Sequence, residues 1–397
     1  MAFELNPSAT SSWAFHNPVR IRFGPGRLKD LAGIEEGGRI LLVTTPGFTR
    51  RGVTGRVAGL VGRDRLVVHD AVQPNPDLDD VEAIATRHRG SEVSAIVALG
   101  GGSAMDTAKA LSVLMGKGGE GFSLRAHFER KAPLPSSAAL PIYAVPTTAG
   151  TGAEVTPFAT IWERATEKKH SLSGPSLFPH TAIVDPELTL GLPEAETIAS
   201  GLDALSQGLE SIWNKNANPI TVGLATRTVA LALDTLPRLL HAPGDVHLRA
   251  RMMEASLLSG LAISVTRTAL AHSMSYPLTA RFGIPHGLAC SFMLPALLEY
   301  NTAADDGRLA RLANELGLAD WKELRERLRD LLLRVDMPKR LRAYLPNPAD
   351  SFELVPQMFT PGRADNNLRA VDAEAIGDIL AKAWEDLELK AAPTAEG

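Results

Sequence analysis

The chain has 397 residues, of which 45% are hydrophobic and 22% are charged. This balance is typical of a globular protein and argues against a disordered or collagen-like chain. The length exceeds what one hydrophobic core usually serves, so two domains are expected. The formal net charge of −4 gives no bulk attraction to nucleic acid or to anionic membranes. An anionic substrate must therefore be held by a few local cations.

Cysteine content and the N-terminal segment indicate the compartment. Cys290 is the single cysteine, so the chain can form no internal disulfide and no thiolate metal cluster. The first thirty residues contain no basic region followed by an apolar one, which a secretory signal requires. No apolar run approaches the ~18 residues of a membrane span. We therefore expect a soluble, cytoplasmic protein.

The first half of the sequence alternates between strand-like and helical segments. Apolar, β-branched runs, each bounded by Gly, Pro, Asp or other polar residues, occupy 40–44, 66–69, 95–99, 142–145 and 182–184, and helical candidates such as 78–88 lie between them. Apolar runs without alternation suit strands that are covered on both faces. The alternation of strand and helix predicts a parallel sheet in an α/β domain.

After about residue 190 the pattern becomes helical. Apolar residues recur every three or four positions, as in Leu202, Leu205, Leu209 and Ile212, and again in Leu324, Leu328, Leu331 and Leu332. Such stripes are typical of amphipathic helices. We therefore predict an α/β domain over 1–190 and an all-helical domain over 191–397. The last residues, 390–397, are expected to fray.

A glycine-rich segment, ALGGGSAMDTAK, follows the strand predicted at 95–99. Glycines allow the backbone to approach a phosphate closely, and the N-terminus of the next helix offers free N–H groups. The spacing is neither that of a Walker loop nor GxGxxG, and a flexible turn would also explain it. Its place at the end of a buried strand favours binding of a dinucleotide pyrophosphate at a switch point of the sheet.

Two more loops follow predicted strands. PTTAGTGAEVT, at 146–156, is rich in hydroxyls and glycine and suits phosphate or ribose contacts better than an ordinary surface turn. TTPGFTRRG, at 44–52, lacks the carboxylate that usually binds the adenosine ribose. Thr45 and Gly47 leave room there, and Arg50 and Arg51 can pair with a 2′-phosphate. The alternative is a pair of exposed arginines. We predict NADPH as cofactor, with NADH as the other possibility.

Candidate metal ligands lie in the helical half. His272 and His286 flank SMSYPLTARFGIP, and Asp203 lies upstream in SGLDALSQGLESIW. Imidazole and carboxylate are donors that a catalytic divalent metal prefers, although each histidine alone would more commonly be a packed residue. Ser200 is expected to cap the helix that carries Asp203 and Gln207. Glu210 fits a solvated or salt-bridged group.

Six blocks of sequence together resemble the iron-containing (group III) alcohol dehydrogenase family. They are FGPG, GGGSAMDTAK, PTTAGTGAEVT, IVDPEL, GLDALSQGLE and FGIPHG, in that order over nearly the whole chain. The resemblance implies the dehydroquinate synthase-like fold, a dinucleotide-binding domain followed by a helical metal- and substrate-binding domain. It also implies a metal site of one Asp and three His, with Fe²⁺ or Zn²⁺ as the ion. The matching positions are Asp203, Gln207, His272 and His286, so glutamine replaces one histidine.

The resemblance also implies cofactor and catalytic residues. The implied cofactor contacts are Gly101, Gly102, Ser103, Asp106, Thr147, Thr148, Thr151 and Lys169. Thr45 replaces the family's NAD-selecting aspartate, in agreement with NADPH. Tyr276 stands where many members carry a further histidine, so we expect the proton relay to run through Tyr276 or water, beside His272.

Two segments, ESIWNKNANP and SVTRTALAHSMSYPLTARFGIPHG, resemble the phosphonoacetaldehyde reductase (hydroxyethylphosphonate dehydrogenase) branch of phosphonate biosynthesis. Arg267 lies five residues before His272 and is expected to extend over the substrate pocket from the same helix. An arginine there can hold a phosphonate through paired hydrogen bonds, although a surface salt bridge would also explain it. Lys215 is a second candidate.

The sequence thus predicts a metal-dependent NAD(P)H-linked reductase of a small aldehyde, with phosphonoacetaldehyde as the expected substrate and a homodimer as the expected assembly. Succinic semialdehyde and lactaldehyde are alternative substrates. A dehydroquinate synthase-like lyase is a third reading, but the several basic residues that its polyhydroxylated acid would need are not found. A metal-free protein that serves only as an oligomer partner is the fourth.

Overall fold

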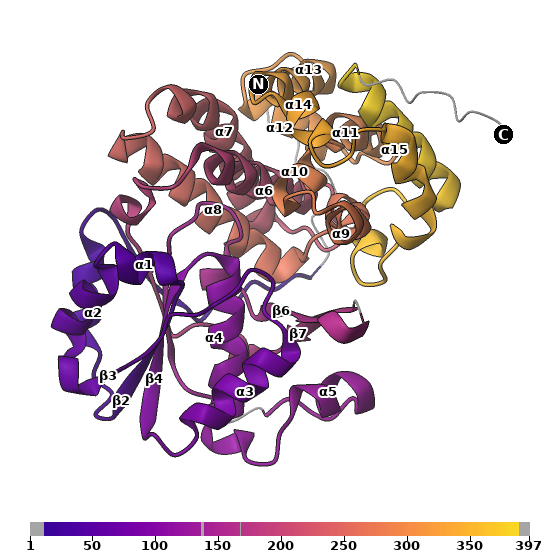
Figure 1. The fold of residues 1–397 in the computed structure, drawn as a ribbon. Coiled ribbons are helices and arrows are strands. Elements are labelled where there is room, and N and C mark those ends of the chain that lie inside the picture. The colour runs from indigo at the N-terminus through magenta and orange to yellow at the C-terminus, as the bar shows by residue number, and fades with distance from the viewer. Residues whose placement is uncertain (1–11, 136–138, 167, 389–397) are drawn as a thin grey trace.

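The structure is a computed structural model that describes residues 12–135, 139–166 and 168–388. A parallel sheet occupies the N-terminal half and a group of helices the C-terminal half (Figure 1). The sheet has six strands in the order β1-β8-β5-β4-β2-β3. Its strands are β1 (Arg20–Phe23), β2 (Arg39–Val43), β3 (Leu66–His69), β4 (Val93–Gly100), β5 (Ile142–Pro146) and β8 (Thr181–Val184).

Helices cover both faces of this sheet. On one face α3 (Leu78–His88) and α4 (Gly102–Met115) pack with the alternate strand residues Leu41, Ile96 and Ala144. On the other face α2 (Val53–Val61) packs with Ile40, Val97 and Val145. The remaining helices of this half are α1 (Pro46–Arg50) and α5 (Leu124–Arg130). The predicted α/β fold with a doubly covered parallel sheet is confirmed.

Three strands were not predicted. One is the edge strand β1, whose sequence RIRF is mostly exposed. The other two, β6 (Phe158–Glu163) and β7 (Lys168–Ser173), form a separate antiparallel pair. The residues of β6 alternate between partly exposed and buried, whereas β7 is mostly exposed or partly exposed and carries two lysines and a histidine. A search for continuous apolar runs therefore passes over them.

The order of strands creates a switch point between β2 and β4. From β2 the chain moves outward to β3, then returns to the opposite side of β2 to form β4 and, beyond it, β5. Loops that follow neighbouring strands on either side of such a reversal separate and leave a crevice, where ligands bind in open α/β sheets. The loops after β2 and β4 contain Thr45 and Gly101 respectively.

The C-terminal half is built from helices, as predicted. They are α6 (Glu194–Ile212), α7 (Pro219–His241), α8 (Val246–Thr266), α9 (Leu270–Phe282), α10 (His286–Ser291), α11 (Leu294–Thr302), α12 (Arg308–Glu315), α13 (Trp321–Arg334), α14 (Met337–Arg342) and α15 (Ala373–Asp386). Helix α6 is surrounded by α7, α8 and α10, and every residue from Gly201 to Ile212 is buried. Within the described ranges, none of these helices combines the length and apolarity that crossing a bilayer needs. We place the proposed domain boundary near 190, between β8 and α6.

Two local predictions were wrong. Helix α6 begins at Glu194, after Pro193, so Ser200 lies inside it and its hydroxyl donates to the Glu196 carbonyl at 2.6 Å. Arg267 does not share a helix with His272, because α8 ends at Thr266 and α9 begins at Leu270. The break falls at Arg267, whose φ of 60° ends the helical path.

Candidate metal and cofactor site

The structure brings Asp203, His272 and His286 together from three helices. Asp203 lies on α6, His272 on α9 and His286 at the start of α10. The Nε2 atoms of His272 and His286 lie 3.3 and 4.0 Å from the same oxygen, Oδ1 of Asp203. Asp203 and His272 are only 4% and 3% exposed. Atoms spaced in this way can all contact one ion, so the geometry suits a buried cation site.

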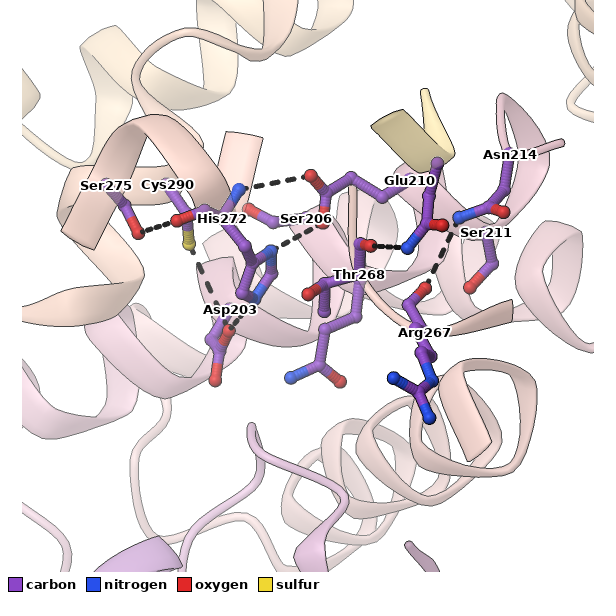
Figure 2. Close-up of polar contacts among 12 residues, drawn as sticks. Asp203, Ser206, Glu210, Ser211, Asn214, Arg267, Thr268, His272, Ser275 and Cys290 are labelled. Atoms are coloured by element: carbon purple, nitrogen blue, oxygen red, sulfur yellow. Dashed lines mark hydrogen bonds and ion pairs between the residues drawn. The ribbon is translucent and has the colours of Figure 1, made fainter. Parts of the chain in front are cut away.

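Glu210 fixes the orientation of His272. Two turns after Asp203 on α6, it is fully buried and accepts hydrogen bonds from the His272 backbone N at 3.1 Å and from Nδ1 at 2.5 Å (Figure 2). Bonding at Nδ1 leaves Nε2 directed at Asp203, as metal-binding histidines usually require. Of the two sequence-based interpretations of Glu210, the solvated group is wrong, and the salt-bridged group agrees with its pairing to His272. Its helix is buried on all sides, which the leucine stripe alone did not reveal.

The charges of this group favour a cation at its centre. Burial alone lowers the pKa of His272, but Glu210 and Asp203 raise it to about 10. Burial lowers the pKa of His286 to about 3. Burial raises the pKa of Asp203, yet the bond from His272 and the other neighbours bring it below its usual value. Two buried carboxylates thus require positive charge beside them, which a divalent metal would supply. The donors present fit such an ion.

Two further side chains border the three donors. Gln207 Oε1 accepts a hydrogen bond from the Ser259 hydroxyl at 2.8 Å, and its Nε2 lies 3.4 Å from the Thr151 carbonyl. In this orientation the amide oxygen faces Ser259, and a half-turn of the amide would place that oxygen against the Thr151 carbonyl, which cannot donate. Cys290 was not expected at the site, yet its Sγ lies 4.0 Å from Asp203 Oδ1 and belongs to the same group of donors. Its spacing of four residues from His286 is the signal that the sequence offered.

Tyr276 lies beside the histidines and links the two halves of the molecule. Its ring stacks on that of His286 with centroids 6.1 Å apart, and Nζ of Lys169 lies 3.5 Å from the centroid of the Tyr276 ring. Lys169 belongs to β7 and Tyr276 to α9. Burial raises the pKa of Tyr276, but the charges of Lys169, His272 and Arg363 bring it below its ordinary value. The phenol is therefore well placed to exchange a proton.

The two phosphate-loop candidates lie against one another. A Cβ at Gly101 would stand 3.2 Å from the Thr148 side chain, and one at Gly102 would stand 3.1 Å from Thr151. Helix α4 begins at Gly102, and no side chain caps its first N–H groups. Thr147 N donates to the Gly100 carbonyl at 3.1 Å, which joins the ends of β4 and β5. The predicted glycine and threonine residues thus surround the N-terminus of a 14-residue helix.

Other predicted cofactor residues have structural partners. Ser103 Oγ accepts from the Asn75 backbone N at 3.2 Å, and Asp106 accepts from Thr160 N at 3.0 Å. Burial raises the pKa of Asp106 to about 6 despite nearby Lys109. Lys109, which is fully buried, donates to the Phe158 carbonyl at 2.8 Å. These contacts attach the β6–β7 pair to α4 and so position Lys169.

The loop after β2 lies on the other side of the crevice. Thr45 is the residue before α1, and Gly47 lies in its first turn. The guanidinium of Arg51 lies 4.5 Å from the centroid of the Phe48 ring, and Nη1 would be 3.0 Å from a Cβ at Gly47. Arg50 and Arg51 are both exposed. This loop therefore carries two long, exposed, positively charged side chains, those of Arg50 and Arg51, and residues 44–52 contain no carboxylate.

The two substrate candidates are placed differently. Arg267 lies between α8 and α9, and its carbonyl accepts from Asn214 at 3.4 Å (Figure 2). Its side chain is exposed, and partial burial together with the charge of Arg363 lowers its pKa. Lys215 donates through Nζ to the Asp365 carbonyl at 3.0 Å. Its ammonium group thus holds the chain near Asp365.

Gly287 makes the closest backbone approach in the site. A Cβ there would lie 1.8 Å from the Ala199 carbonyl oxygen on α6. Gly287→Ala should therefore push α10 and His286 away from Asp203 and lower stability by about 1–3 kcal/mol or more. Thermal unfolding measures the loss. Gly377→Ala, in α15 with nothing within 4 Å of the added Cβ, is the matched control and should not destabilise. An unchanged melting temperature for Gly287→Ala would refute the close packing.

The sequence was compared with protein families and with known proteins, and the matches are to dehydrogenases and reductases. Residues 18–186 match the iron-containing alcohol dehydrogenases, and residues 197–384 match the C-terminal region of that family. Phosphonoacetaldehyde reductase of Streptomyces viridochromogenes is 34% identical over 364 residues, covering 87% of this chain and 90% of that protein. 4-Hydroxybutyrate dehydrogenase of Cupriavidus necator is 32% identical, covering 77% and 81% respectively.

Among solved structures, sulfoacetaldehyde reductase from Bifidobacterium kashiwanohense in complex with NAD⁺ has a TM-score of 0.87 and 32% identity, and it covers 94% of this chain and 99% of that one. The predicted class, a metal- and nicotinamide-dependent alcohol dehydrogenase or aldehyde reductase, agrees with these relatives. The chain therefore belongs to the iron-containing alcohol dehydrogenase family.

Proposed function

We propose that the protein reduces phosphonoacetaldehyde to 2-hydroxyethylphosphonate with NADPH or NADH. The observation that carries this proposal is the convergence of Asp203, His272 and His286, of which the first two are buried and His286 is partly exposed. The similarity to phosphonoacetaldehyde reductase and to sulfoacetaldehyde reductase supports a two-carbon aldehyde with an acid group. Because the formal net charge of the protein is −4, an anionic substrate needs a positively charged side chain near the site in order to bind.

The metal would be held by Asp203, His272 and His286, with Gln207 as the proposed fourth ligand. When bound, the divalent metal, Fe²⁺ or Zn²⁺, supplies a Lewis acid for the aldehyde oxygen, and reduced nicotinamide supplies hydride for the aldehyde carbon. Glu210 keeps Nδ1 of His272 engaged and so fixes the direction of Nε2. Tyr276 Oη holds the proton that passes to the product oxygen, either directly or through water.

The cofactor would lie across the crevice between β2 and β4. Gly101, Gly102 and Ser103 at the start of α4 would bind its pyrophosphate. Thr147, Thr148 and Thr151 would donate hydroxyls to phosphate or ribose, and Asp106, which holds β6 through Thr160 N, would border the cofactor. Lys169 lies over Tyr276 and would contact the nicotinamide end. Thr45, Gly47 and Arg50 would surround the adenosine ribose.

Cofactor preference can be tested at Thr45. Thr45→Asp adds a carboxylate where a 2′-phosphate would lie, so kcat/KM with NADPH relative to NADH should fall at least about 10-fold. Steady-state rates with the two nucleotides measure this ratio. Thr86→Asp, on the exposed side of α3, should leave the ratio unchanged. If the wild-type enzyme already strongly prefers NADH, the NADPH assignment is wrong.

Other substrates and classes give different results in one experiment. NADPH consumption is followed with phosphonoacetaldehyde, sulfoacetaldehyde, succinic semialdehyde, lactaldehyde and propanal. A clear preference for succinic semialdehyde or lactaldehyde would identify the alternative reductases. No turnover of any aldehyde by metal-loaded protein would favour the lyase reading. Elemental analysis without bound metal, even after reconstitution, would indicate a metal-free oligomer partner.

We further propose a cytoplasmic homodimer with no nucleic-acid or membrane partner. The net charge of −4 argues against nucleic-acid and anionic-membrane partners, and the single buried cysteine suits a reducing compartment. The homodimer is proposed from the resemblance to the family. Light scattering on the purified protein measures the mass directly. A monomer mass would contradict the proposed assembly without affecting the proposed reaction.

A further inference from the structure

Arg267 occupies a backbone conformation that suits glycine. Its φ is 60° and its ψ is 179°, a region that residues with a Cβ seldom adopt. The backbone is held there from both sides: Arg267 N donates to the Ile263 carbonyl at 2.9 Å, and its own carbonyl accepts from Thr266 Oγ1 at 2.9 Å. Glycine would fit this position without strain. An arginine at such a place points to a role for its side chain.

The second feature is a segment that crosses α9, residues 358–367, called here the C-terminal strap. Ser273 on α9 donates to the Met358 carbonyl at 2.6 Å and accepts from Thr360 N at 2.7 Å. At the other end, Asn366 donates to the Thr268 carbonyl at 2.9 Å, next to Arg267. The strap is thus attached at both ends to the segment that carries Arg267 and His272. Between these attachments it carries Arg363.

Arg363 and Arg267 lie close enough to influence one another. Asn366 Nδ2 donates both to the Thr268 carbonyl at 2.9 Å and to the Gly362 carbonyl at 3.0 Å, so the residues next to Arg267 and Arg363 share one donor. Partial burial and, after it, the charge of Arg363 lower the pKa of Arg267. Among the residues that the structure describes, neither arginine forms an ion pair with a carboxylate. Arg363 Nη1 donates to its neighbour's carbonyl, that of Gly362, at 2.8 Å, and the Arg363 guanidinium also hydrogen-bonds the Tyr276 side chain. Two guanidinium groups near one another without a counter-charge favour binding of an anion.

The direction in which the Arg267 side chain extends agrees with a role in binding an anion. Its carbonyl faces Asn214, while its guanidinium extends to the same side as the Asp203 carboxylate (Figure 2). Arg363 hydrogen-bonds the side chain of Tyr276, whose ring stacks on His286. Both arginines are thus tied to residues that adjoin Asp203, His272 and His286. A planar guanidinium binds tetrahedral oxyanions through paired hydrogen bonds better than a lysine does.

We propose that Arg267 and Arg363 together form a subsite for a tetrahedral oxyanion, the acid group of a short aldehyde substrate. The assignment of the aldehyde end to Asp203, His272 and His286 rests on the proposed function. The subsite itself does not, because it predicts anion binding whether or not the aldehyde is reduced. Phosphonate, sulfonate and carboxylate share the required charge, and they differ in shape and charge number.

Two measurements on the metal-loaded enzyme test the subsite. The first is the ratio of kcat/KM for phosphonoacetaldehyde to that for propanal, with sulfoacetaldehyde and succinic semialdehyde as further arms. The second is calorimetric binding of ethylphosphonate, which cannot react. Arg363→Ala and Arg267→Ala should each lower the ratio and the ethylphosphonate affinity roughly 10- to 100-fold. Arg363→Lys should retain part of both, since the charge remains without the fork.

Two controls separate binding from folding. Arg281→Ala removes one exposed positive charge from the far end of α9, about 16 Å away along the helix, and should change neither quantity. Arg267→Gly should lose ethylphosphonate affinity while its melting temperature stays equal to or above that of the wild type, because the strain is relieved. A purely structural arginine would instead lose stability.

The possible outcomes distinguish the proposed subsite from the proposed function. Equal losses on propanal and phosphonoacetaldehyde, or unchanged ethylphosphonate binding in both arginine variants, would overturn the subsite. If wild type binds ethylphosphonate through these arginines but does not reduce phosphonoacetaldehyde, the proposed function fails and the subsite stands. The preferred acid group is then given by whichever of the sulfonate and carboxylate arms is reduced.

Discussion

Replacing His272 by alanine is expected to remove bound metal and to lower kcat/KM roughly 10³-fold or more, because the metal contributes several kcal/mol of transition-state stabilisation. The imidazole lies between two buried carboxylates, 3.3 Å from Asp203 and 2.5 Å from Glu210. Its removal leaves both carboxylates without their principal positive partner. Elemental analysis and NADPH consumption measure the two losses.

His241→Ala is the matched control for this prediction. His241 is exposed at the end of α7, so its removal should change neither metal content nor rate. The His272 variant should also be less stable, by about 3–5 kcal/mol, since breaking a buried pair leaves charge uncompensated. Full metal content together with wild-type turnover in His272→Ala would contradict the site described here.

Replacing Glu210, which accepts the hydrogen bond from Nδ1 of His272, should cause the second largest loss, a loss of metal affinity. Glu210→Gln keeps the size of the side chain but loses its charge, so metal affinity should fall about 10- to 100-fold, as it does when outer ligands of metal-bound histidine are changed. Glu210→Ala should be worse, because it also leaves a cavity in a fully buried position. Competition with a chelator of known affinity gives both values.

Glu254→Gln serves as the comparison for the Glu210 variants. Glu254 pairs with Arg227 on the surface, with both side chains more than a third exposed, and such pairs contribute little. Its metal affinity should equal that of the wild type. If Glu210→Gln retains wild-type metal affinity, Glu210 is a packing residue and its bond to His272 has no part in metal binding.

Much of the α/β half could be predicted from the sequence, for a physical reason. Strands covered on both faces must be apolar throughout, so β2, β4 and β5 stand out as continuous runs. Helix α3 was predicted at its observed bounds, and in the structure the Asp77 side chain caps its first turn by accepting from Asp79 N. The edge strand β1 and the pair β6–β7 have mixed polarity. Tertiary contacts, which a local pattern does not contain, decide such segments.

The helical half was predicted in kind but not at its breaks. The sequence SVTRTALAHS contains neither glycine nor proline, so nothing local indicates that α8 ends at Thr266. The break depends on the strained backbone of Arg267. The opposite error occurred in α6, where Ser200 looked like a cap but lies within the helix. Capping residues are also tolerated inside buried helices when their hydroxyls bond to the preceding turn.

In the candidate site too, some residues could be identified from the sequence and others only from the structure. Asp203, His272 and His286 were proposed from their donor chemistry and then matched to a family's ligands, and the structure brings them together. Glu210 and Cys290 were not recognised, because their importance depends on which helices surround them. Arg363 gave no signal at all, since it lies more than ninety residues beyond His272 and is brought close only by the C-terminal strap.

The central claim is that Asp203, His272 and His286 hold one divalent cation at the crevice. Anomalous diffraction from crystals of the metal-loaded enzyme, recorded at the absorption edge of the bound metal, tests it most directly. The account predicts one strong peak at about 2.0–2.2 Å from Asp203 Oδ1 and from both Nε2 atoms. A peak elsewhere on the protein, or side chains that face away from it, would contradict the account.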